Sequence, residues 1–92
     1  MRGDDSKMEI NNVTEAVKIA REKLVEINGV MGVIMFQIES VNLIKYSKNQ
    51  NKETWKIRCS YYTNMAGVER VSREVFIDKE SGEIIDLNGY NN

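Results

Sequence analysis

The stretch TWKIRCSYY, residues 54–62, decides the fold of this chain. Its apolar positions alternate with polar ones, which is the period of an extended strand. One face carries Trp55, Ile57, Cys59 and Tyr61. The other face carries Lys56, Arg58, Ser60 and Tyr62. This pattern predicts a strand of an antiparallel sheet that is buried on one side and solvated on the other.

A helix is predicted upstream of this strand. Asn12 and Glu15 have the spacing of a capping box, in which the Asn side chain accepts from a backbone N–H of the first turn. Asn28 and Gly29 end the helix, because glycine readily takes the left-handed conformation. Apolar residues recur every three or four positions between these ends, at Val13, Ala16, Val17, Ala20, Leu24 and Ile27. We expect this stripe to face the sheet.

Residues 33–46 predict one long, bent strand or two short ones. The apolar positions change phase within this segment, so a bulge or kink near Glu39 and Ser40 is needed to keep one face buried. Two further strands are predicted at 71–77 and 84–87. A helix followed by strands with short links predicts an α+β fold. In it one N-terminal helix packs on a three- to four-stranded antiparallel sheet, in the order α-β-β-β-β.

The 92 residues form one domain, which we place at residues 12–88. Residues 1–11 are expected to be a mobile leader and residues 89–92 a frayed tail. Residues 64–67 are expected to end the strand that precedes them. Thirteen basic against fourteen acidic side chains leave a net charge of −1, which gives no global attraction to nucleic acid or membrane. No signal peptide or membrane span is evident, so we expect a cytoplasmic protein.

The sequence offers little catalytic chemistry. It contains no histidine, the usual general base. Cys59 is the only cysteine, which rules out an internal disulfide and a cysteine-based zinc site. Its place on the apolar face of the strand predicts a buried, inert thiol. We therefore expect no enzyme activity, no cofactor and no metal.

FIDKESGEII, residues 76–85, offers two interpretations. Its carboxylates resemble the ligands of a cation loop, but Gly82 stands where the next ligand should fall. The favoured interpretation is a hairpin turn, in which Asp78 accepts backbone N–H bonds and Gly82 takes a positive φ.

The segment from Lys45 to Arg58 is the one local excess of positive charge. Together with interleaved aromatic rings, it has the components of a surface that binds single-stranded nucleic acid. Trp55 and Tyr61 lie on the apolar face, however, which leaves Tyr62 as the stacking platform. A solvated, lysine-rich edge is the favoured interpretation.

The chain resembles the PepSY domain family. The resemblance rests on the helix that opens Asn12-Val13-Thr14-Glu15-Ala16, on Trp55-Lys56-Ile57, and above all on the hairpin from Glu74 through Asp78 and Gly82 to Ile85. It implies a cystatin-like helix on an antiparallel sheet, without catalytic residues, that binds or restrains another protein. A looser resemblance is to the gas-vesicle accessory protein of type O.

We expect a non-enzymatic binding or regulatory domain. Its partner is an unidentified protein, bound through an edge strand or through the exposed sheet face that carries Lys56, Arg58, Ser60 and Tyr62. Homodimerisation through the bare sheet is also expected to be favourable. The alternatives are single-stranded nucleic-acid binding through residues 45–58, an intracellular protease inhibitor and a gas-vesicle accessory protein.

Overall fold

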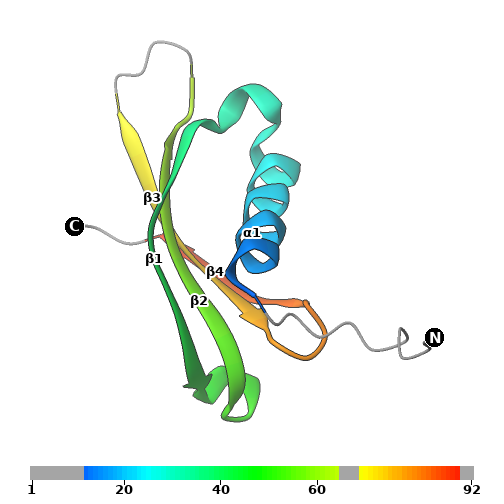
Figure 1. Cartoon of the computed structure of the whole chain (residues 1–92). Coiled ribbons are helices and arrows are strands. Elements are labelled where there is room, and N and C mark those ends of the chain that lie inside the picture. Colours follow the sequence, from blue (N-terminus) through cyan, green and yellow to red (C-terminus); the bar gives the residue numbers. More distant parts are fainter. Residues whose placement is uncertain (1–11, 65–68, 90–92) are drawn as a thin grey trace, which may run out of the picture.

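The computed structural model describes residues 12–64 and 69–89. Helix α1 (Val13–Asn28) lies on one face of a four-stranded sheet (Figure 1). The strands are β1 (Ile34–Tyr46), β2 (Lys52–Tyr62), β3 (Arg70–Asp78) and β4 (Ile84–Gly89). Each strand pairs antiparallel with the next, in the order β1-β2-β3-β4. The predicted α+β fold is confirmed, with four strands.

Helix α1 begins and ends as its sequence predicts. The Asn12 side chain accepts a hydrogen bond from the backbone N–H of Glu15 at 2.8 Å, which satisfies one free donor of the first turn. Gly29 follows the helix with φ 85° and ψ 160°. Its N–H donates to the carbonyl of Val25 at 2.7 Å. Only glycine adopts this backbone region at low cost.

The predicted apolar stripe of α1 is wrong at both ends. Val13 and Ile27 are exposed, and the buried line runs through Ala16, Ala20 and Leu24 at intervals of four. Asn28 follows Leu24 by four positions and is exposed, but its side chain donates to the Tyr61 hydroxyl at 3.3 Å. A polar residue therefore takes the place that Ile27 was expected to fill, because it reaches a polar partner on the sheet.

The core lies between α1 and the face of β2 that the sequence identified as apolar. Trp55, Ile57, Cys59 and Tyr61 are all buried there. Val75 and Ile77 of β3 stand opposite Ile57 and Trp55 and extend the same face. A short 3-10 helix, η2 (Val30–Gly32), carries the chain from α1 into β1. The buried side of the sheet is thus continuous from β2 to β3.

Strand β1 is a single strand with two irregularities. Its register on β2 shifts between Ile38 and Ser40, which confirms the bulge predicted near Glu39. A second shift, between Ile34 and Gln37, was not predicted, and Met35 there has φ 55°. The Arg70 guanidinium donates to the Met35 carbonyl at 3.2 Å. A contact from another strand thus helps hold a conformation that the local sequence does not favour.

Strand β4 extends two residues beyond the predicted strand at 84–87. Gly89 belongs to β4 and stands opposite Arg73, because the pairing of β3 with β4 continues past residue 88. The expected leader at 1–11, the rest of the tail at 90–92 and most of the break at 64–67 lie outside the described residues.

Candidate interaction surfaces

The sheet face away from α1 carries the four residues predicted as an interaction surface. Lys56, Arg58, Ser60 and Tyr62 do lie together there, on alternate positions of β2. Ser60, however, is only 1% exposed. The Arg70 guanidinium donates two hydrogen bonds to its hydroxyl, at 2.9 and 3.1 Å. The same guanidinium lies 4.6 Å from the centre of the Tyr62 ring. The prediction that Ser60 is part of the accessible surface is therefore wrong.

Two cations of this face, Lys56 and Arg58, share one carboxylate. Arg58 Nε lies 2.8 Å from Glu74 Oε2, and Lys56 Nζ lies 3.8 Å from the same atom. Glu74 stands directly opposite Arg58 in the β2–β3 register. Opposite charges facing each other across two strands stabilise the pairing. Sequence reasoning missed Glu74, because its partner depends on the strand register.

An aromatic pair lies on the same face. The rings of Tyr46 and Phe76 are stacked, with centres 4.1 Å apart and planes 6° apart. The Tyr46 hydroxyl donates to Asp86 at 2.9 Å, and the Lys48 ammonium lies 3.5 Å from that carboxylate. Burial, followed by this hydrogen bond, raises the pKa of Tyr46 to about 12. The Tyr46 hydroxyl lowers the pKa of Asp86.

These contacts bear on the predicted nucleic-acid surface. Lys48, Lys56 and Arg58 each lie beside a carboxylate, and Lys45 stands opposite Glu53 in the β1–β2 register. Among the rings, Trp55 and Tyr61 are buried under α1, Tyr46 is stacked on Phe76, and Tyr62 lies under Arg70. Lys48, Lys56, Arg58 and the four rings thus make contacts within the domain.

The turn at residues 78–83 has the geometry of a hairpin connection. Asp78 Oδ2 accepts from the backbone N–H of Ser81 at 2.9 Å and from its hydroxyl at 2.8 Å. Gly82 has φ 78°. Within the described residues, no three acidic or cysteine side chains come close enough to share a metal ion.

Asp78 also joins this turn to the turn between β1 and β2. The side-chain amide of Asn49, in the 3-10 helix η3 (Ser47–Asn49), donates to Asp78 Oδ1 at 2.8 Å and to the Thr54 hydroxyl at 3.0 Å. Asn49, Thr54 and Asp78 are buried. Burial raises the pKa of Asp78, but the hydrogen bonds from Asn49 and Ser81 outweigh it, so the pKa is lowered. The sequence predicted the Asp78 turn and missed the role of Asn49.

Cys59 lies in the core and has no exposed surface. Burial, assisted by the charge of Glu39, raises the pKa of its thiol to about 11, against the opposing effect of Arg73. The thiol is therefore protonated at neutral pH, as expected for an inert cysteine.

An open hollow of about 330 Å³ lies at the turn end of the molecule and is lined by Lys45, Asn51, Lys52, Glu53, Lys79 and Glu80.

The outer edge of β1 is the longest stretch of backbone that the sheet leaves without a neighbouring strand. Within residues 12–64 and 69–89, β1 pairs only with β2. Its regular part runs from Ser40 to Tyr46, between the Glu39 bulge and η3. Leu43, at the middle of this run, is 40% exposed.

The direction of the backbone groups of β1 follows from two hydrogen bonds. The Tyr46 carbonyl accepts from Asn51 N–H at 2.9 Å and so points toward β2. The Glu53 carbonyl accepts from Lys79 N–H at 3.1 Å and so points toward β3. The N–H and C=O groups of its neighbour Lys52 therefore point toward β1. Successive residues of a strand direct these groups to alternate sides. The N–H and C=O groups of Val41, Leu43 and Lys45 therefore point away from the sheet.

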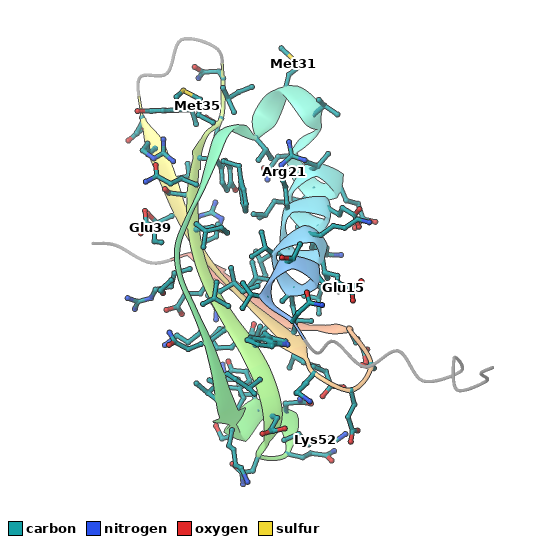
Figure 2. The ribbon with its side chains drawn as sticks, viewed as in Figure 1. Glu15, Arg21, Met31, Met35, Glu39 and Lys52 are labelled. Atoms are coloured by element: carbon teal, nitrogen blue, oxygen red, sulfur yellow. The ribbon has the colours of Figure 1, made fainter. Side chains whose placement is uncertain are left out.

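Apolar side chains are also exposed at the opposite end of the molecule from the turns. Met31 and Met35 project at this end (Figure 2). Ile27 and Val30 are exposed as well.

Comparison with known protein families, with curated proteins and with solved structures gives no match for this chain. Among the described residues, the helices are too short or too polar to cross a membrane.

Proposed function

We propose that this protein is a non-enzymatic binding domain that takes an extended segment of a protein partner onto the outer edge of β1. The observation that carries the proposal is the run Ser40–Tyr46, in which Val41, Leu43 and Lys45 direct their N–H and C=O groups outward. Strand addition to such an edge uses backbone hydrogen bonds for affinity and alternate side chains for specificity. We also propose a PepSY-like relationship, which the helix-on-sheet order and the Asp78 turn support.

The sheet face away from α1 supports this role less well than the edge. Lys56 and Arg58 are paired with Glu74, and the Ser60 hydroxyl is covered by Arg70. A partner on that face would have to replace these internal contacts, and each desolvated charge would need a new partner. The edge of β1 requires no such exchange, because its outward backbone groups lie outside the pairing with β2.

A proline substitution separates edge binding from other modes. Leu43→Pro removes an N–H that points away from β2, so the internal sheet keeps its hydrogen bonds while strand addition loses a donor. Leu43→Ala is the matched control, because it shortens the side chain and keeps the N–H.

The assay is affinity capture from the native lysate, with the partner identified by mass. We expect Leu43→Pro to lose the partner that the unmodified protein and Leu43→Ala retain. The combined variant Lys56→Ala, Arg58→Ala and Tyr62→Ala should also retain it. Retention by Leu43→Pro, with loss by the combined variant, would transfer the site to the sheet face and overturn the proposal. Trp55 fluorescence verifies that each variant is folded, because this buried ring is the only tryptophan.

A further inference from the structure

Asn28 and Gly29 form the joint between α1 and η2 (Figure 1). We propose that this link is a site of spontaneous modification, at which Asn28 loses its side-chain amide as ammonia and becomes an aspartyl or isoaspartyl residue. The reaction takes water as its reactant and proceeds when the last turn of α1 opens while the sheet stays folded. The site is separate from the β1 edge and does not depend on the role of that edge.

The chemistry needs only these two residues, a base in solution and water. The base removes the proton of the Gly29 backbone nitrogen, which then attacks the side-chain carbonyl carbon of Asn28. A new C–N bond closes a cyclic succinimide, and the bond from that carbon to Nδ2 breaks, releasing ammonia with a proton taken from water. Water then opens the ring at either carbonyl, which gives aspartate or isoaspartate. Glycine favours the attack because it has no Cβ beside the nitrogen, and asparagine is among the thermolabile residues.

The folded chain keeps the two reacting groups apart. Gly29 N–H donates to the Val25 carbonyl at 2.7 Å, which engages the proton that the base must remove. The Asn28 amide donates to the Leu24 carbonyl at 3.0 Å and to the Tyr61 hydroxyl at 3.3 Å. The contact with Leu24 turns the Asn28 side chain away from Gly29, because helical side chains lean toward the N-terminus of their helix. The reaction therefore requires these hydrogen bonds to open together.

Opening at this joint requires little unfolding. Asn28 and Gly29 are exposed and lie at the end of α1, and helix ends open at low free energy. The space around Gly29 is empty, since a Cβ built there meets nothing within 4 Å, so no neighbour has to move to admit the ring. The buried residues of α1 lie a full turn or more earlier, and Leu24 is the last of them. Solvent therefore reaches the link while Leu24 stays in the core.

The chain has one other Asn–Gly link, Asn88–Gly89. It lies within β4, where its two residues stand opposite Glu74 and Arg73 of β3. The Asn88 side chain is also hydrogen-bonded to Asp86. Its conversion follows opening of the β3–β4 pairing and not of the α1 end. This link therefore serves as an internal reference for Asn28.

Conversion alters the end of α1. An aspartate has no N–H group to donate to the Leu24 carbonyl, and its charge lies at the negative end of the helix dipole. Isoaspartate also lengthens the main chain by a methylene group between Asn28 and Gly29, which breaks the alignment of Gly29 N–H with Val25. The modified protein, separated by its added negative charge, should therefore unfold at a lower urea concentration than the unmodified protein.

Peptide mapping by mass spectrometry follows both links, because trypsin places them in separate peptides, residues 24–45 and 80–92. The protein is incubated in mildly alkaline buffer, folded or unfolded in urea. We expect Asn28 to convert in the folded protein, about tenfold or more slowly than in the unfolded chain. Urea too dilute to unfold the protein should change this rate less than about twofold, because local opening exposes little surface. A rise of about fivefold or more per M of urea would mean that global unfolding controls the reaction.

Tyr61→Phe tests the contact that holds Asn28. It removes one acceptor of the Asn28 amide, so conversion of Asn28 should be about two- to tenfold faster, which corresponds to a hydrogen bond of ordinary strength. Conversion of Asn88 in the same sample should stay unchanged. Tyr62→Phe is the matched control, because the Tyr62 ring lies against Arg70.

Several results would overturn the proposal. These are no conversion of Asn28 in the folded protein, equal rates in the folded and unfolded chains, the steep dependence on dilute urea, and an unchanged Asn28 rate in Tyr61→Phe. An equal rise at Asn88 in Tyr61→Phe would assign the effect to a general loss of stability and would also overturn it.

Discussion

The Asp78 carboxylate should be the most sensitive polar group in the fold. It accepts three hydrogen bonds, from Asn49 Nδ2, Ser81 N and Ser81 Oγ, at 2.8–2.9 Å. Asp78→Ala removes all three. It also leaves the buried Asn49 amide with the Thr54 hydroxyl as its remaining acceptor among these groups. The two turns at this end of the sheet would lose the side chain that joins them.

The size of the effect follows from these contacts. A hydrogen bond to a charged group contributes about 1.5–3 kcal/mol to stability, and a buried polar group left unsatisfied costs about 1–3 kcal/mol. Because bonds that share one carboxylate are not additive, we expect the free energy of unfolding to fall by about 3–5 kcal/mol. A domain of this length has roughly 5–14 kcal/mol in total, so the variant should be close to the limit of folding.

Urea unfolding, followed by Trp55 fluorescence, measures this loss. The midpoint should fall by at least about 1 M, given slopes of about 1–3 kcal/mol per M. Glu80→Ala is the matched control, because it removes an exposed carboxylate from the same turn. It should change stability by less than about 0.5 kcal/mol. If Asp78→Ala shifted the midpoint no more than Glu80→Ala does, the reasoning would be refuted.

Acid should reproduce part of the loss. The pKa of Asp78 is lowered in the folded state, so its contribution to stability is present above the ordinary pKa of about 3.9. That contribution is lost as pH falls from this value through the folded pKa. The Asp78→Ala variant should therefore show a shallower acid transition than the unmodified protein. Equal slopes below pH 4 would contradict this assignment.

The other predictions concern one ionisable group and one glycine. Tyr46 has a folded pKa of about 12 against an ordinary 10.0, so stability should be lost as pH rises through this window. Urea titrations at several pH values measure the free energy of unfolding of Tyr46→Phe and of the unmodified protein. The variant should lose less of it between pH 10 and 12, and an equal loss in both proteins would contradict the prediction. Gly29→Ala should cost about 1–3 kcal/mol, because a Cβ there meets nothing within 4 Å and only the backbone is strained. Thermal unfolding measures the loss in Gly29→Ala. Asn28→Ala is the control, because it removes the neighbouring contact to Tyr61 and leaves the Gly29 backbone unchanged.

Periodicity predicted the elements of the fold because each reports local geometry. The alternation of residues 54–62 fixed which side of β2 is buried, and the change of phase near Glu39 required the bulge that the β1–β2 register contains. The helix stripe was less accurate. Ile27 satisfies the helical period, but the position in line with Leu24 belongs to Asn28, whose partner Tyr61 is distant in sequence.

The candidate site was only partly predictable for the same reason. Alternation placed Lys56, Arg58, Ser60 and Tyr62 on one face, yet it could not show that Arg70 would cover two of them. Arg70 and Glu74 reach these residues through the register of β3 on β2. Strand register is set by packing along both strands together, so neither strand reveals it alone.

The sequence by itself therefore determined the class of fold, the buried face of β2 and the hairpin at Asp78 and Gly82. Each of these depends on side-chain period or backbone preference within a few residues. Tertiary structure alone decided that Asn49 joins the two turns, that the cations of the outer face are held internally and that β1 stands at the edge. These depend on which distant segments come together, and that is fixed by the packing of the whole sheet against α1.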